Sequence, residues 1–212
     1  DETYRKAEKA GANVVTQRKK GKGDAIRTGL KNSDSPISVF MDADILNIRP
    51  EMIRELVVDI QKDFDFVISD FDREGGRVTE LVANPLLNKF FPEINLNQPL
   101  TGEFAGRTEI LKKTPIRDGW GAQVDILINN WLDEDIEAKE THIGFKDHKR
   151  KPLSELIDMA DGVSTAILEH ARRLEKIKKI DSKMTPLFTA EEDRNRSSEI
   201  ETENSEICKA KE

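Results

Sequence analysis

The chain has 212 residues, and its 41 Asp and Glu outnumber its 34 Lys and Arg, which gives a formal net charge of −7. This acidic balance argues against a general nucleic-acid binder, because no basic field is present to neutralise a phosphate backbone. The single cysteine, Cys208, excludes a disulfide framework and a cysteine-based metal site. No apolar segment is long enough to span a bilayer and no signal peptide is visible, so we expect a soluble cytoplasmic protein that binds neither membrane nor nucleic acid.

The first residues enter a helical pattern directly, without an initiator Met, and we expect upstream residues to be missing. Residues 3–11 predict a helix that Gly11 ends, and residues 13–16 predict a short strand. Gly21 and Gly23 then flank Lys22, and Asp24 is placed to cap a following amphipathic helix. This loop fits a phosphate cradle, although in isolation it fits a basic surface turn better.

Residues 36–45 form an apolar run that ends in two carboxylates, Asp42 and Asp44. Such a run predicts a buried strand of a parallel sheet, and ligands bind beyond the carboxyl ends of such strands. Residues two apart on a strand point to one side, so the two carboxylates can converge on one divalent cation. A solvated turn is the alternative. A helix from residue 49 and a strand at 64–69 complete a βαβ unit, which implies a parallel pair.

The middle of the chain is rich in glycine. Residues 72–80 carry Arg77 in a loop that fits either a small-anion site or a flexible hairpin turn. Residues 98–107 are too polar and glycine-punctuated for a plain core element, and the glycines around Glu103 suggest backbone that lines a cleft. A short helix is expected at 108–113.

Towards the C-terminus, an apolar helix at 124–131 places Gln123 in its first turn, where it can face a ligand. A strand is expected at 136–142, followed by a basic turn in which His148 is more typical of a solvated residue than of a ligand. Residues 153–180 predict one long amphipathic helix, or two separated near Gly162. From Ala190 onward the polar composition predicts disorder.

Six motifs in this order carry a family resemblance: GKGDAI, MDAD, GRVTELVANPLL, QPLTGEFAGR, GWGAQVDILI and HKRKPLSEL. From about residue 21 to 159 the chain resembles the glucosyl-3-phosphoglycerate synthases, retaining glycosyltransferases close to the mannosyl-3-phosphoglycerate synthases. The resemblance implies the α/β GT-A fold, a Rossmann-like mixed sheet flanked by helices, here without its first strand or strands and with a long C-terminal helix. It implies a catalytic domain at 1–152, a helical segment at 153–182 and a polar tail at 183–212.

The resemblance also implies a role for individual residues. Donor binding would fall to Lys22, Glu103 and the Asp-x-Asp motif of Asp42, Ala43 and Asp44. Asp44, with Asp42 and His148, would ligate Mg²⁺ or Mn²⁺. The phosphate and carboxylate of 3-phosphoglycerate would be held by four consecutive residues and a distant arginine: Gly76, Arg77, Val78, Thr79 and Arg150. Leu100, Thr101 and Gln123 would act with Asp44 at the donor sugar.

Three positions depart from the family pattern: Gln123 stands where Glu is common, Lys146 where Arg is usual, and Arg150 where a polar uncharged residue is frequent. A neutral amide still hydrogen-bonds sugar hydroxyls but is neither a base nor a charge. The resemblance as a whole implies a homodimeric enzyme that moves glucose from a nucleotide-sugar to 3-phosphoglycerate. The alternatives are a mannose donor, another family-2-like acceptor such as a lipid phosphate, or a sugar-nucleotide binder without turnover.

Overall fold

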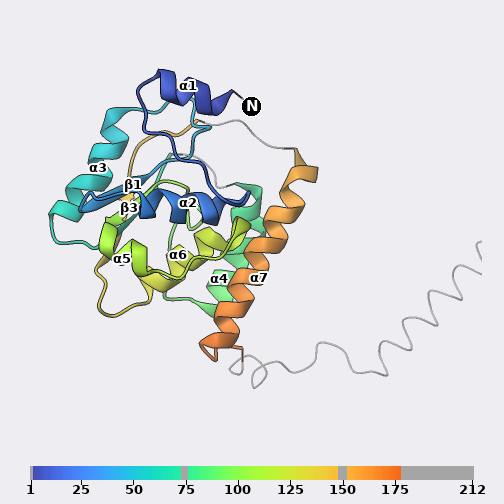
Figure 1. The fold of residues 1–212 in the computed structure, drawn as a ribbon. Helices are drawn as coiled ribbons and strands as arrows, with labels where there is room; N and C mark the ends of the chain where they lie inside the picture. Colours follow the sequence, from blue (N-terminus) through green and yellow to red (C-terminus); the bar gives the residue numbers. More distant parts are fainter. Residues whose placement is uncertain (1, 73–75, 148–151, 178–212) are drawn as a thin grey trace, which may run out of the picture. The chain divides into compact units, whose positions relative to one another are not determined.

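The structure is a computed structural model that describes residues 2–72, 76–147 and 152–177. Its helices are α1 (Thr3–Lys9), α2 (Lys22–Lys31), α3 (Pro50–Gln61), α4 (Asn84–Phe90), α5 (Thr108–Lys113), α6 (Ala122–Trp131) and α7 (Ile157–Arg173) (Figure 1). The strands are β1 (Ile37–Phe40), β2 (Phe66–Asp70), β3 (Phe104–Arg107) and β4 (Ala138–His142). A π-helical turn, η1 (Thr79–Ala83), and two 3₁₀ turns, η2 (Gly119–Gly121) and η3 (Leu153–Leu156), complete the set. All of these elements belong to a unit that ends at Leu174.

The four strands form one mixed sheet in the order β1-β3-β2-β4. Strand β3 is antiparallel to both β1 and β2, and β2 is parallel to β4. Strands β1, β2 and β4 therefore run in one direction, and their carboxyl ends meet at one edge of the sheet. We expected β1 and β2 to be neighbouring parallel strands. They run parallel, but they are not neighbours, because β3 lies between them. Residues 104–107, which we expected to line a cleft, are instead a central strand.

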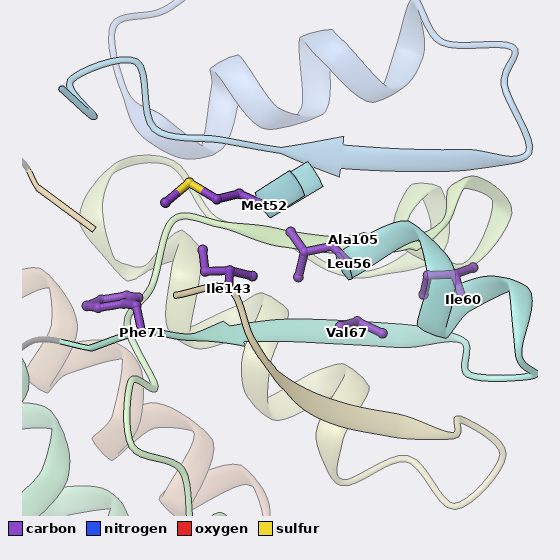
Figure 2. Close-up of a cluster of buried hydrophobic side chains, with 7 residues drawn as sticks. All are labelled: Met52, Leu56, Ile60, Val67, Phe71, Ala105 and Ile143. Carbon is purple, nitrogen blue, oxygen red and sulfur yellow. The ribbon is translucent and has the colours of Figure 1, made fainter. Parts of the chain in front are cut away.

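Helix α3 covers one face of the sheet. It begins with Pro50, whose fixed φ suits the first turn of a helix. Figure 2 shows the core beneath α3, in which its side chains pack on residues of β2 and β3 and of the segments that follow β2 and β4. The members are Met52, Leu56, Ile60, Val67, Phe71, Ala105 and Ile143. Burial of these side chains stabilises the layer by about 1.5–3 kcal/mol for each large residue.

Aromatic residues fill the opposite face, because successive strand residues point to opposite sides. The rings of Phe40 and Phe104 stack with centroids 4.7 Å apart, and Phe66 lies 6.1 Å from Phe104. Helix α2 packs against α5 and α6, and its Ile26 lines a cavity with Phe40 and Phe104. The sheet thus has helices on both faces, and its carboxyl edge is left for a site.

The other predicted strands and helices agree with the structure only in part. Residues 13–16 form no strand, and β1 ends at Phe40 rather than at Ile45. The helices predicted at 3–11, 108–113 and 124–131 and the strand at 136–142 are present. Helix α7 runs without a break through Gly162, but it is shorter than the predicted 153–180, because residues 153–156 form the 3₁₀ turn η3 and the helix ends at Arg173. Residues 178–212 lie outside the described residues. In the part that the structure describes, no helix is long and apolar enough to cross a membrane.

Candidate active site

The centre of the site is an ion pair between α2 and the loop after β1. Lys22 Nζ lies 3.0 Å from Asp42 Oδ1, and both side chains are partly exposed. They line a cavity of about 210 Å³ together with Met41, Ala43 and Gly102, among others. Asp42 and Asp44 follow the end of β1 instead of lying on it, so the argument from alternating strand residues does not apply to them. Asp44 is exposed in a turn.

The glycine-rich loop before α2 is organised by Asp24, although not as predicted. Helix α2 begins at Lys22 with Gly21 as its N-cap residue, so Asp24 lies inside the first turn. Its carboxylate accepts hydrogen bonds from the backbone amides of Arg18 and Lys19, both at 3.0 Å. The bond from the Lys19 amide is the main reason that the pKa of Asp24 is lowered. The carboxylate therefore takes two of the amides that a phosphate cradle would use.

Gly23 allows this loop to approach the segment before η2. A Cβ at position 23 would overlap the backbone carbonyl oxygen of Arg117. Arg27 fixes the same segment, because its guanidinium donates to the Ile116 carbonyl and pairs with Asp118. The position of Lys22 thus depends on contact between two backbones.

We expect Gly23→Ala to lower the free energy of unfolding by about 2 kcal/mol, because overpacking against a backbone group cannot be relieved by side-chain rotation. Urea unfolding followed by circular dichroism measures the change. Gly29→Ala, also in α2, is the matched control, since a Cβ there would meet only the Phe40 ring at 3.9 Å. Equal stability of the two variants would contradict the close approach at Gly23.

A buried polar network lies beneath the cavity. The carboxylate of Glu103, fully buried, pairs with Lys146 and accepts a hydrogen bond from Thr101 Oγ1 at 2.7 Å. Thr101 Oγ1 also lies 2.7 Å from Ser69 Oγ. The other oxygen, Glu103 Oε1, accepts from the amide of Asp42 at 3.3 Å. Glu103 therefore holds the backbone of the loop that carries Asp42, and it compensates the charge of Lys146, which also lies over the Phe71 ring.

Gln123 is the second residue of α6 and is 4% exposed. Among the residues that the structure describes, neither its Oε1 nor its Nε2 has a hydrogen-bond partner, although both atoms are buried. A buried amide without partners costs about 1–3 kcal/mol. Gln123 is not among the residues that line the cavity of Lys22 and Asp42.

The remaining predicted residues are distributed as follows. Gly76 and Arg77 are exposed, Val78 and Thr79 are buried where η1 begins, and Leu100 is half-buried. His148 and Arg150 lie outside the described residues. Within 2–72, 76–147 and 152–177, no group of three His, Cys, Asp or Glu residues is placed to hold a metal ion. The hard oxygens of Asp42 and Asp44 nevertheless suit Mg²⁺ or Mn²⁺.

A second, larger cavity of about 450 Å³ lies between α6, α7 and residues 115–117. Its lining includes none of Lys22, Asp42 and Asp44, and we place the chemistry at the smaller cavity for that reason. Its wall contains Asp125, which accepts hydrogen bonds from the Arg117 amide at 2.7 Å and from His170 Nε2 at 2.8 Å. Arg117 also pairs with Glu169. This network was missed in the sequence, although a lone Asp in an apolar helix signals a buried partner.

Comparison with known proteins identifies the family. The family model of glycosyl transferase family 2 matches residues 1–120. The chain belongs to glycosyl transferase family 2. Glucosyl-3-phosphoglycerate synthase of Petrotoga mobilis is 36% identical over 178 residues, which cover 76% of this chain and 54% of that protein. The synthase of Mycolicibacterium paratuberculosis is 32% identical over 194 residues, covering 79% and 59%.

Solved structures of a family member agree with the fold. A crystal structure of the Mycobacterium tuberculosis glucosyl-3-phosphoglycerate synthase, in complex with Mn²⁺, UDP-glucose and phosphoglyceric acid, has a TM-score of 0.76 and 32% identity. The match covers 81% of this chain and 65% of that chain. The predicted GT-A fold is confirmed. The chain spans between about half and two thirds of the length of these relatives.

Proposed function

We infer that this family 2 chain belongs to a metal-dependent retaining glycosyltransferase that moves glucose from UDP-glucose to 3-phosphoglycerate. The observation that carries the proposal is the pair of Lys22 and Asp42 above a buried glutamate, at the carboxyl edge of the sheet. The solved relatives that bind Mn²⁺, UDP-glucose and phosphoglyceric acid support it. We also infer a cytoplasmic homodimer.

In this proposal the donor diphosphate lies against Lys22. The leaving group gains negative charge as the glycosidic bond breaks, and a preorganised ammonium group stabilises that charge. Asp42 holds the Lys22 ammonium in the cavity before the donor arrives. Asp44 and His148 would hold Mn²⁺ or Mg²⁺, which supplies further charge neutralisation when bound.

Two further groups orient the substrates. The buried amide of Gln123, which has no hydrogen-bond partner among the described residues, would read hydroxyls of the donor sugar, with the backbone of Leu100 and Thr101 alongside. Residues 76–79 and Arg150 would bind the two anionic ends of 3-phosphoglycerate, so that its hydroxyl faces the anomeric carbon. A retaining reaction without an enzymic nucleophile requires attack from the face that the diphosphate leaves.

Turnover tests the proposal. The full-length protein with Mn²⁺, UDP-glucose and 3-phosphoglycerate is expected to release UDP, and omission of any of the three should stop the release. Asp44→Ala is expected to lower kcat about 100-fold through loss of electrostatic stabilisation. Asp34→Ala, which removes another exposed aspartate from a loop before β1, is the control and should leave kcat unchanged.

Each alternative has its own outcome. Faster release of GDP from GDP-mannose than of UDP from UDP-glucose would show that GDP-mannose is the donor. Binding of UDP-glucose in calorimetry without any turnover would favour the non-catalytic binder. Unchanged kcat in Asp44→Ala would show that the metal assignment is wrong.

A further inference from the structure

The two outermost strands send loops towards each other across the carboxyl edge of the sheet. Strands β1 and β4 lie at opposite ends of the order β1-β3-β2-β4, and they run in the same direction. The loop after β1 carries Asp42 and Asp44 and reaches residue 49, where α3 begins. The described part of the loop after β4 is residues 143–147, and His148 follows it in the sequence. Because the strands are not neighbours, contact between these loops must come from the loops themselves.

Asn47 provides most of that contact. Its Nδ2 donates to the carbonyl oxygen of Phe145 at 2.8 Å, and its Oδ1 accepts from the amide of Asp147 at 2.8 Å. The amide of Leu46 also donates to the carbonyl oxygen of Asp147 at 2.8 Å. One side chain therefore satisfies two backbone groups of the other loop, in the manner of a paired strand.

The same two loops meet again on the inner side. Lys146, between the two residues that Asn47 contacts, points into the core and pairs with Glu103. Glu103 in turn accepts a hydrogen bond from the Asp42 amide. The loop after β4 is thus fixed by Asn47 on its outer side and by Glu103 on its inner side, and both bonds lead back to the segment of Asp42 and Asp44.

We propose that Asn47 is a positioning residue that holds the loop after β4 against the loop after β1, which carries Asp42 and Asp44, and thereby sets the affinity of the site for a divalent cation with a nucleoside diphosphate. Only a side chain with both a donor and an acceptor makes the two bonds at once. Partners that orient metal-binding loops from outside the ligand set typically alter metal affinity 10- to 100-fold when they are lost. The proposal rests on the proposed function for its ligand class.

The test compares Asn47→Ala with Asn32→Ala in the full-length protein. Asn32 is exposed at the end of α2, where its Nδ2 donates to the Thr28 carbonyl at 2.8 Å, so its replacement also removes a side-chain bond to the backbone. Three quantities are measured: the Kd of UDP in the presence of Mn²⁺ by calorimetry, the Mn²⁺ concentration for half-maximal turnover, and the KM for 3-phosphoglycerate. For Asn47→Ala, but not for Asn32→Ala, we expect the Kd of UDP and the half-maximal Mn²⁺ concentration to rise about tenfold. The KM for 3-phosphoglycerate should stay within twofold of the wild-type value.

Two readouts separate positioning from general stability and from the proposed reaction. Hydrogen exchange of the metal-free protein should accelerate at the Leu46 and Asp147 amides in Asn47→Ala, while the melting temperature stays near that of Asn32→Ala. If the wild type shows no turnover, the proposed function fails, but the Mn²⁺-dependent Kd of UDP still tests Asn47. Equal Kd values in Asn47→Ala, Asn32→Ala and the wild type would overturn the inference, as would a lower melting temperature with an unchanged Kd.

Discussion

Replacement of Asp125 by Asn is expected to lower the free energy of unfolding by about 3 kcal/mol, because it leaves a buried ionic network without its anion. Asp125 is 3% exposed and contacts Arg117 and His170, each through a side-chain hydrogen bond. Arg173 donates to His170 Nδ1 at 2.9 Å, and since a guanidinium only donates, His170 must carry its proton on Nε2, towards Asp125. Asn keeps the size of Asp but loses the charge that compensates Arg117. Chemical unfolding in urea measures the difference.

The control for this variant is Glu169→Gln, which removes the other carboxylate that pairs with Arg117. The Glu169 side chain is 61% exposed, and exposed ion pairs contribute less than about 1 kcal/mol. The effect of Asp125→Asn should also depend on pH. Burial raises the pKa of Asp125, but hydrogen bonds from His170 and Arg117 outweigh burial and hold that pKa below its usual value of 3.8. Because its pKa is lowered in the folded state, the ionised Asp125 carboxylate stabilises the folded protein above pH 3.8. This contribution disappears as the pH falls through the folded-state pKa. A difference between wild type and variant that stays constant in more acidic solution would contradict this account.

The sequence located the carboxylates of the candidate site but not the reason for their placement. An apolar run that ends in Asp42 correctly indicated the carboxyl end of a strand, but the prediction of a buried strand was wrong, because β1 lies at the edge of the sheet and three of its four residues are only half-buried. The strand itself is four residues long, and the two aspartates lie in the connection that follows. What fixes Asp42 is contact with Lys22, Gly102 and Glu103, and these residues come from segments 20 to 61 positions away. Local periodicity carries no information about such contacts.

Strand β3 shows the same limit for the fold. Its sequence, Phe-Ala-Gly-Arg, has little β-propensity pattern, and Gly106 argues against a strand. The glycine is needed because Leu111 and the Asp65 carbonyl approach it closely, so that a Cβ would meet Leu111 at 3.0 Å. Residues 13–16 show the opposite case, since their β-branched valines suggest a strand but the structure gives them no ladder. Strand formation in both cases is decided by partners. The helices other than α4 were predicted because their periodicity is local.

Gly102→Ala is expected to lower kcat/KM about 100-fold while leaving the fold intact, because a small displacement of a reacting group costs roughly that much. Gly102 precedes β3, and the carboxylate of Asp42 packs directly on its Cα, where an added Cβ would overlap all three carboxyl atoms. The backbone of Gly102 is not among the positive-φ positions, so alanine itself introduces no strain. The carboxylate must therefore move, and it then loses Lys22. Steady-state release of UDP measures the result.

The contrast with Gly23→Ala gives this prediction its specificity. At Gly23 the obstacle is the backbone of Arg117, which cannot rotate away. At Gly102 the obstacle is the end of the partly exposed Asp42 side chain, which can rotate. We therefore expect the first substitution to reduce stability and the second to reduce activity at nearly unchanged melting temperature. Gly29→Ala again serves as the control. Because alanine favours a helix interior over glycine, this variant should be more stable than the wild type by up to about 1 kcal/mol. If Gly102→Ala retained kcat/KM within threefold of the wild type, the packing of Asp42 against Gly102 would have no part in catalysis, and the position of Lys22 would have to depend on the contacts of α2 alone.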